Sequence, residues 1–187
     1  MADKRKPYNC LLGGKMNAAM GSEFRNRLNQ EFRRESDRGC AILSACLIEE
    51  ALLSVFSKVL PEGEKTSRQF MSRGRLTQGV KNAAALGLIR EPLVGNLELI
   101  IKVRNVFAHK LLDGLTFESP EIRSHAMQLT LPNLDNTSEA SRKRIEEVSR
   151  ERYMEVFGFA IASLERIRMI AERYPVYEEL PSALIEI

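Results

Sequence analysis

Hydrophobic positions recur at helical spacing along most of this chain. Phe24, Leu28 and Phe32 lie four residues apart, which predicts a helix over residues 23–34 with one apolar stripe. Residues 36–60 are apolar on nearly every side and are followed by Pro61, so we expect a central, buried helix there.

The middle of the chain predicts two further helices. A helix over residues 75–86 should stop at Gly87, because glycine readily adopts the left-handed conformation that ends helices. Pro92 is expected in the first turn of a helix over residues 92–109, where its missing N–H group costs no hydrogen bond.

The last third predicts a short helix and a long one. Ser119 and Pro120 have the residue types of a helix cap and a first helical position. Ser138 can cap a final helix that continues to about residue 173, with a charged part at residues 142–152 that lies in solvent or on a partner. No strand pattern is found, so the sequence predicts an all-α bundle of about six to seven helices.

Length and composition bound the organisation of the chain. Its 187 residues suit one domain, and we expect an irregular N-terminal arm at 1–21, a helical domain at 22–174 and a tail at 175–187. The basic residues 4–6 precede no apolar run, and we expect no apolar stretch to approach the length of about 18 residues that a bilayer span needs. We therefore expect a cytoplasmic protein without a membrane segment.

Charge and cysteine content exclude several kinds of site. The net charge of +3, from 28 basic and 25 acidic side chains, is too small for a typical nucleic-acid-binding surface. Cys10, Cys40 and Cys46 form no CxxC pair and have no nearby histidine, so neither a zinc site nor a disulfide framework is predicted. Motifs for nucleotide binding and for serine hydrolases are missing from the sequence. We expect no metal and no cofactor.

The most informative segment is residues 104–109, Arg-Asn-Val-Phe-Ala-His. At 100° per residue, Arg104 falls in the middle of the apolar stripe of its helix, and Glu49 falls on an apolar face of the central helix. Burying an unpaired charge is costly, so we predict an ion pair between Arg104 and Glu49. In this interpretation Asn105 and His109 bond to a neighbouring loop.

Two other interpretations of this segment stay open. Arg104 could hold a phosphate and His109 could transfer a proton in a polar cleft, although their directions differ by about 140° on an ideal helix. Convergence on one substrate would need a helix break or a second subunit. Alternatively, the cleft near Arg104 and Glu49 recognises a small ligand or a partner. His125 is expected to be a surface or half-buried residue rather than a catalyst.

A helix-turn-helix over residues 77–101 is disfavoured by its own residues. Its second helix would present Leu93, Val94, Gly95 and Leu97 to the bases, whereas base reading needs exposed polar side chains near the helix N-terminus. Sequence-specific DNA binding by this element is therefore not expected.

Three segments together resemble the mannitol operon repressor family. They are residues 35–40 (ESDRGC), residues 85–89 (ALGLI), and residues 99–109 running into residues 115–122 (LTFESPEI). The resemblance covers about residues 24–170. It implies an all-helical transcriptional regulator with no recognised DNA-binding motif. Because the predicted helical core is complete and no base-reading element is found, we expect the protein to act through contacts with another protein or with a second copy of itself.

Arg104, Asn105 and His109 also match the short arginine–histidine pattern of the HEPN superfamily. That resemblance implies a metal-independent endoribonuclease or toxin-like protein. In it, Arg104 would contact the phosphate and His109 would activate a ribose hydroxyl. Our leading interpretation is the regulator, without enzymatic activity, and the HEPN enzyme is the alternative.

Overall fold

The computed structural model describes residues 28, 30–61, 63–71, 75–110, 113–135 and 137–173. The chain divides into two units, residues 1–34 and 35–187. In the first unit, residues 30–34 are helical, within the predicted helix over residues 23–34. The predicted arm at 1–21 and tail at 175–187 lie outside the described residues, as does Cys10, so the domain boundaries stay predictions.

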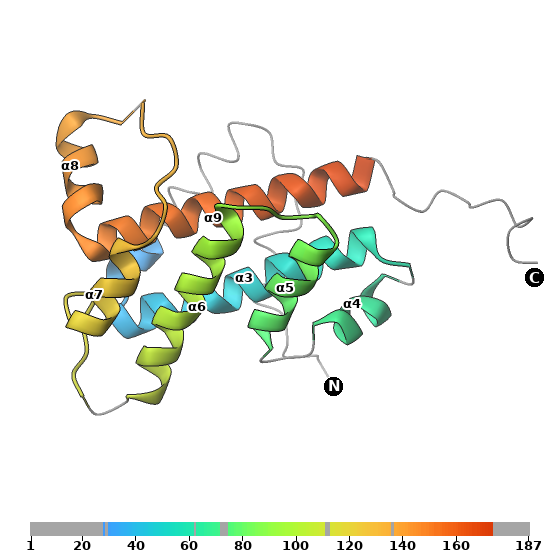
Figure 1. The fold of residues 1–187 in the computed structure, drawn as a ribbon, viewed down its shortest axis with the longest axis horizontal. Coiled ribbons are helices and arrows are strands. Elements are labelled where there is room, and N and C mark those ends of the chain that lie inside the picture. The colour runs from blue at the N-terminus through green and yellow to red at the C-terminus, as the bar shows by residue number, and fades with distance from the viewer. Residues whose placement is uncertain are drawn as a thin grey trace, which may run out of the picture. The chain divides into compact units, whose positions relative to one another are not determined.

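The second unit is an all-α bundle, which confirms the predicted fold class (Figure 1). Its described residues contain no strand. The helices are α3 (Asp37–Val59), α4 (Glu64–Phe70), α5 (Leu76–Ala85), α6 (Leu93–His109), α7 (Pro120–Met127), α8 (Glu139–Glu147) and α9 (Ser149–Arg173).

Helix α3 is the core helix that the sequence predicts over residues 36–60. It begins where the Ser36 hydroxyl accepts a hydrogen bond from the Gly39 N–H group at 3.0 Å. Figure 1 shows α9 running along it, and α3 also packs against α4, α5 and α6. Partners on several sides explain why apolar residues surround almost the whole helix.

By length and composition alone, α3 could also cross a membrane. The expectation that no stretch approaches the required length was therefore wrong. Half of this apolar stretch is buried inside the bundle, as in the core helix of many helical bundles. The composition of α3 thus does not separate a core helix from a membrane span.

Three buried aromatic rings connect α6 to α9. The Phe107 and Phe117 ring centroids are 5.5 Å apart, and those of Phe117 and Tyr153 are 4.9 Å apart. Phe117 lies between α6 and α7, in the segment that carries part of the family resemblance. The rings therefore hold this connecting segment in the core.

Most predicted helix boundaries agree with the structure. Gly87 has φ +70° just beyond α5, which confirms its predicted left-handed conformation. Helix α6 begins directly after Pro92. Ser119 precedes α7 as predicted, but its hydroxyl accepts from the Thr116 N–H group at 3.0 Å and makes no cap bond to the helix. Sequence analysis missed α4, a helix of only seven residues.

The predicted long final helix is instead two helices. Ser138 caps α8, and the chain becomes extended at Val148 before α9 starts. The Ser149 hydroxyl lies 2.9 Å from the Phe117 carbonyl oxygen and 2.5 Å from the Glu118 carboxylate. These contacts fix the start of α9 on residues 117–118, and α8 buries only Ile145. If α8 and α9 formed one straight helix, few further apolar side chains would be buried.

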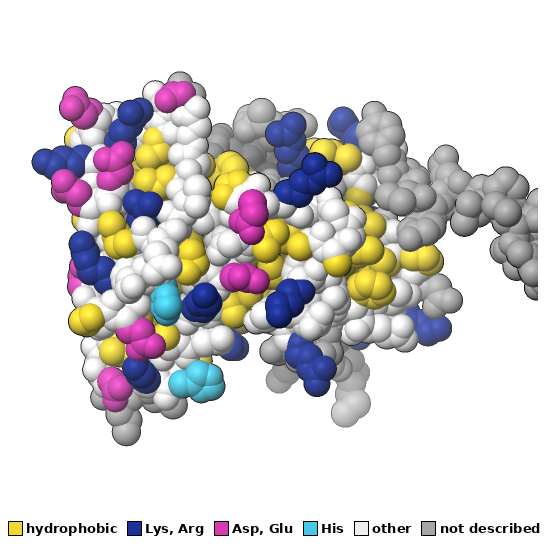
Figure 2. All heavy atoms as spheres, viewed as in Figure 1, with side chains coloured by type: hydrophobic (Ala, Val, Ile, Leu, Met, Phe, Trp, Pro, Cys, Tyr) yellow, Lys and Arg dark blue, Asp and Glu magenta, His cyan; other side chains and the backbone are white. Residues whose placement is uncertain are grey.

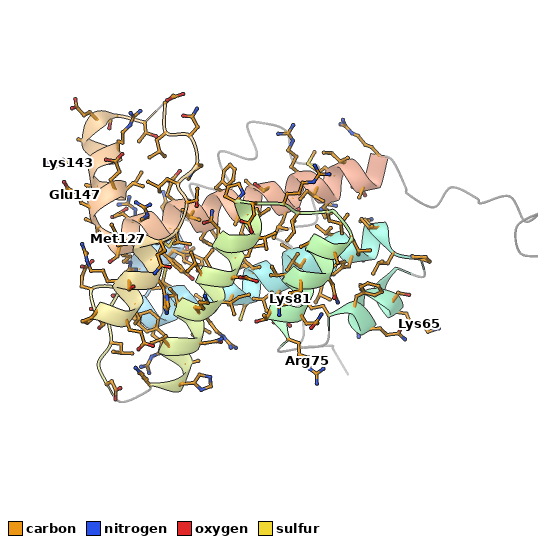
Figure 3. The ribbon with its side chains drawn as sticks, in the orientation of Figure 1. Lys65, Arg75, Lys81, Met127, Lys143 and Glu147 are labelled. Atoms are coloured by element: carbon orange, nitrogen blue, oxygen red, sulfur yellow. The ribbon has the colours of Figure 1, made fainter. Side chains whose placement is uncertain are left out.

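The charged segment over residues 142–152, which includes most of α8 and the start of α9, is exposed in part, as expected. Lys143 and Glu147 point away from the rest of the bundle in Figure 3, and both are exposed. Arg152, at the end of the same segment, is half-buried and bonded to the bundle.

Candidate functional site

A small cleft with a mixed polar and apolar lining brings together three of the four predicted site residues. It has a volume of about 90 Å³ and opens between α3, α5 and α6. Glu49 and Cys46 line it from α3, Thr77 from α5, and Arg104 and Asn105 from α6. The helical spacing argument therefore placed Glu49 and Arg104 on facing sides of one site.

The direct ion pair between Arg104 and Glu49 is not formed. Among the described residues, no ion pair of 4.0 Å or less joins them, and the Arg104 Nη1 atom donates to Asn105 Oδ1 at 3.0 Å instead. Both Arg104 and Glu49 are half-buried. Water can reach both charges at the mouth of the cleft, so neither is forced into a pair.

The charges of the cleft act on the thiol of Cys46. Partial desolvation raises its pKa, the Glu49 carboxylate raises it further, and the Arg104 guanidinium lowers it. Burial, and then the charge of Glu49, also raise the pKa of Glu50. Cys46 is exposed, so its reactivity can report on both charges of the cleft.

Neither histidine of the chain lines this cleft. His109 is the last residue of α6 and is exposed. His125 is half-buried on α7, and its Nδ1 atom has no hydrogen-bond partner among the described residues. In the same part of the chain, no group of three His, Cys, Asp or Glu residues could hold a metal ion. The cleft therefore contains a cation, an amide, a carboxylate and a thiol, but its lining includes no histidine.

A second, larger cavity lies on another side of the bundle. This groove has a volume of about 530 Å³ and lies between three segments: residues 87–96, residues 130–133, and one face of α9. Phe159, Ser163 and Ile167 form its α9 side, while Leu131 and Pro132 face it from the α7–α8 loop. Its lining is mainly apolar, and the Phe159 side chain is 44% exposed.

The loop between α7 and α8 forms one rim of the groove, and side-chain hydrogen bonds hold its backbone at three points. Asn96 is buried on α6 and binds both backbone groups of Thr130, at 2.9 Å and 2.8 Å. Arg152 donates to the Leu129 carbonyl oxygen at 2.7 Å, and Arg142 to that of Leu134 at 2.9 Å. Side chains from α6, α8 and α9 therefore fix the backbone of one short extended loop.

Sequence analysis missed this groove. Asn96 could have indicated it, because Asn96 is a polar residue in the same apolar stripe of α6 as Arg104. No local sequence pattern indicates the contacts of Arg142 and Arg152, since these contacts depend on how the α7–α8 loop returns over the bundle.

Two of the segments that carry the family resemblance, residues 35–40 and 115–122, meet at the start of α3. The Phe117 N–H group donates to Asp37 Oδ2 at 2.8 Å, and Arg150 of α9 pairs with the same carboxylate. Arg38 donates to the Lys110 carbonyl oxygen at 2.8 Å. Residues 35–40 and 115–122 thus form one structural junction, away from the residues that line the groove.

Comparisons with known proteins give one structural neighbour to report. No family model matches the chain, and no curated protein matches it. Among solved structures, it is similar to a chain of the X-ray structure of the MtlR–HPr complex from Escherichia coli. The similarity covers 82% of this chain and 99% of that one, at 20% sequence identity and a TM-score of 0.47.

Proposed function

We propose that the protein is a cytoplasmic regulator of the mannitol-operon-repressor kind, which acts by binding another protein rather than by reading DNA. The observation that carries this proposal is the groove, an open apolar surface with a fixed rim. The resemblance of residues 35–40, 85–89 and 99–122 to that family supports the regulatory role.

The groove is suited to a segment of a partner protein. Its loop rim is already held by Asn96, Arg142 and Arg152, so little conformational freedom is lost on binding. Among the described residues, the N–H groups of Leu131 and Asn133 have no hydrogen-bond partner, and they can bind the backbone of an extended segment. Phe159 supplies exposed apolar area beside them.

The beginning of α6 is unsuited to base recognition. Leu93 is 8% exposed, and the polar atoms of Asn96 are both bonded to Thr130. A recognition helix needs free polar groups at these positions. On the face drawn in Figure 2, charges of both signs are interspersed with hydrophobic side chains, whereas phosphate binding is favoured by a basic patch.

The HEPN-type endoribonuclease is the second candidate. It is favoured by Arg104 and Asn105 lying together in a cleft, where the guanidinium keeps donors free for a phosphate. The position of His109 outside the cleft lining weighs against it. A small-ligand sensor would use the same cleft, whose 90 Å³ is small for a drug-sized ligand.

The test is capture of a partner by the purified, tagged protein from a lysate of its native host. The informative variant is Leu131→Glu, which places a charge in the groove. Leu86→Glu is its matched control, because Leu86 is 43% exposed and is not part of the groove lining. We expect a transcription or sugar-uptake protein to bind the wild type and Leu86→Glu, and to be lost with Leu131→Glu.

Two results would contradict the proposal. One is equal capture by all three proteins. The other is retention of a specific promoter fragment by the purified protein alone at about 150 mM salt, near physiological ionic strength.

A further inference from the structure

Helix α9 carries an exposed stripe that no described element covers. Phe159 and Ile170 are 44% and 50% exposed. They are eleven residues apart, close to three helical turns, so they lie on one face about 16 Å apart along the axis. Arg166, between them on the same face, is exposed as well.

Charges at the two ends of this stripe are opposite in sign. Glu155 lies one turn before Phe159, and Arg173 lies near Ile170 at the end of α9. Glu155, Phe159, Arg166, Ile170 and Arg173 fall within about 60° of one another on the helical wheel. Glu155, Arg166 and Arg173 have no ion-pair partner in the part of the chain that the structure describes.

We propose that this stripe binds the same stripe of a second copy of the chain, with the two α9 helices antiparallel. A two-fold axis between residues 164 and 165 places Phe159 against Ile170 of the second copy, and Ile170 against Phe159 of the second copy. The same axis places Glu155 beside Arg173 of the second copy. An isologous interface requires such self-complementarity, because each contact occurs twice.

The distribution of charge selects the antiparallel arrangement. In a parallel pair, Arg166 of one copy would face Arg166 of the other, and Arg173 would face Arg173. Like charges that face each other across an interface are unfavourable. In the antiparallel pair, Arg166 faces the small side chain of Ser163 instead, and the two Arg166 residues are offset by three positions, about 4.5 Å along the axis. The two apolar contacts, which join four side chains, and the two ion pairs then form together.

The second copy also reaches the groove. Ser163 lines it, so Arg166 of the second copy would add a cation to its α9 side. One helix pair gives an interface at the low end of the range for stable dimers, which bury about 800 Å² per partner. We therefore expect reversible, concentration-dependent association. This inference does not rest on the proposed function, but it uses Phe159, which also lines the groove, so the second copy and a partner segment would compete for this side chain.

The experiment measures mass by sedimentation velocity over a concentration series of the full-length chain. The wild type should shift from the monomer mass toward twice that mass. Ile170→Glu should raise the dimer dissociation constant about tenfold or more, since it buries an unpaired charge. Val148→Glu is the matched control, because Val148 is an exposed apolar residue of 38% exposure outside α9.

A charge exchange tests the register. Glu155→Arg and Arg173→Glu should each weaken association, and the double variant should restore it, since the reversed pair forms again. Circular dichroism verifies that every variant is folded. A monomer at all concentrations, or an equal effect of Val148→Glu and Ile170→Glu, would overturn the proposal. A double variant no tighter than the single ones would overturn the antiparallel register.

Discussion

Two arginine–glutamate sites in this bundle differ in how far water reaches them. On α9, Arg168 and Glu165 are 8% and 4% exposed and form a bidentate pair, with Nη2 2.6 Å from Oε1 and Nε 2.9 Å from Oε2. In the cleft, Arg104 and Glu49 are half-buried and form no direct pair. Burial, rather than position in an apolar stripe, decides whether the charges must pair.

The α9 site also belongs to a larger network. Arg168 contacts Glu172 at 3.3 Å, and Glu172 contacts Lys58 of α3 at 3.4 Å. The neighbouring carboxylates raise the pKa of Arg168, first of all that of Glu165, and Lys58 lowers the pKa of Glu172. This network joins the ends of the two longest helices, so we expect its loss to lower the free energy of unfolding. The loss of a charge in the cleft should change it little.

The largest expected effect is at Arg168. Arg168→Ala leaves the buried carboxylate of Glu165 without its partner and should destabilise the fold by about 3–5 kcal/mol. Chemical denaturation followed by circular dichroism measures this. Lys102→Ala, which removes an exposed cation from α6, is the control and should change stability by less than about 0.5 kcal/mol. Equal losses in the two variants would contradict the role of burial.

Asn96→Ala should have the next largest effect. It leaves the backbone N–H and C=O groups of Thr130 without their partner and should cost about 1–3 kcal/mol. Asn105→Ala is a matched control on the same helix, since Asn105 bonds only the half-buried Arg104 among the described residues. A smaller loss for Asn96→Ala than for Asn105→Ala would show that the groove rim is not held as described.

Glu49→Ala should change stability little. Without a direct pair to Arg104, the loss should stay below about 1 kcal/mol, as for exposed ion pairs. Thermal unfolding measures it. A loss of several kcal/mol would show that the cleft holds a buried pair after all, and the contrast with Arg168 would disappear.

The smallest expected effect is a change in the alkylation rate of Cys46. With Cys10 replaced by serine, iodoacetamide should modify Cys46 and spare Cys40, which is fully buried and has a pKa raised to about 12, mainly by desolvation. The rate should rise with pH toward a midpoint above that of a free cysteine, because the pKa of Cys46 is raised.

The charges of the cleft should change this rate in opposite directions. Glu49→Gln lowers the pKa of Cys46 and should speed alkylation near pH 8, whereas Arg104→Gln raises the pKa and should slow it. Mass spectrometry of the intact protein follows both. Identical rates in the two variants would show that these charges do not act on the thiol.

The helices could largely be predicted from sequence because their signals are local. The apolar spacing of α3, Gly87 after α5 and Pro92 before α6 each act within a few residues. The break at Val148 could not be predicted, since it depends on contacts of Ser149 with residues 117–118, about thirty positions away.

The cleft and the groove show the same limit. Helical spacing brought Arg104 and Glu49 to one site, but it could not tell how much water enters there. The pair of Arg168 with Glu165 has a local i, i+3 spacing, and its burial depends on tertiary packing. The groove needs a loop from one end of the bundle to lie on α6 and α9, which no local pattern encodes.

The central claim is that the protein acts through contacts and not through catalysis by Arg104 and His109. Incubation of purified wild-type protein with single-stranded RNA in excess chelator tests it most directly. We predict no cleavage above a protein-free control. Chelator-resistant cleavage that falls about 10²- to 10⁴-fold in a folded His109→Ala variant, the loss expected for a proton-transfer group, would contradict the claim.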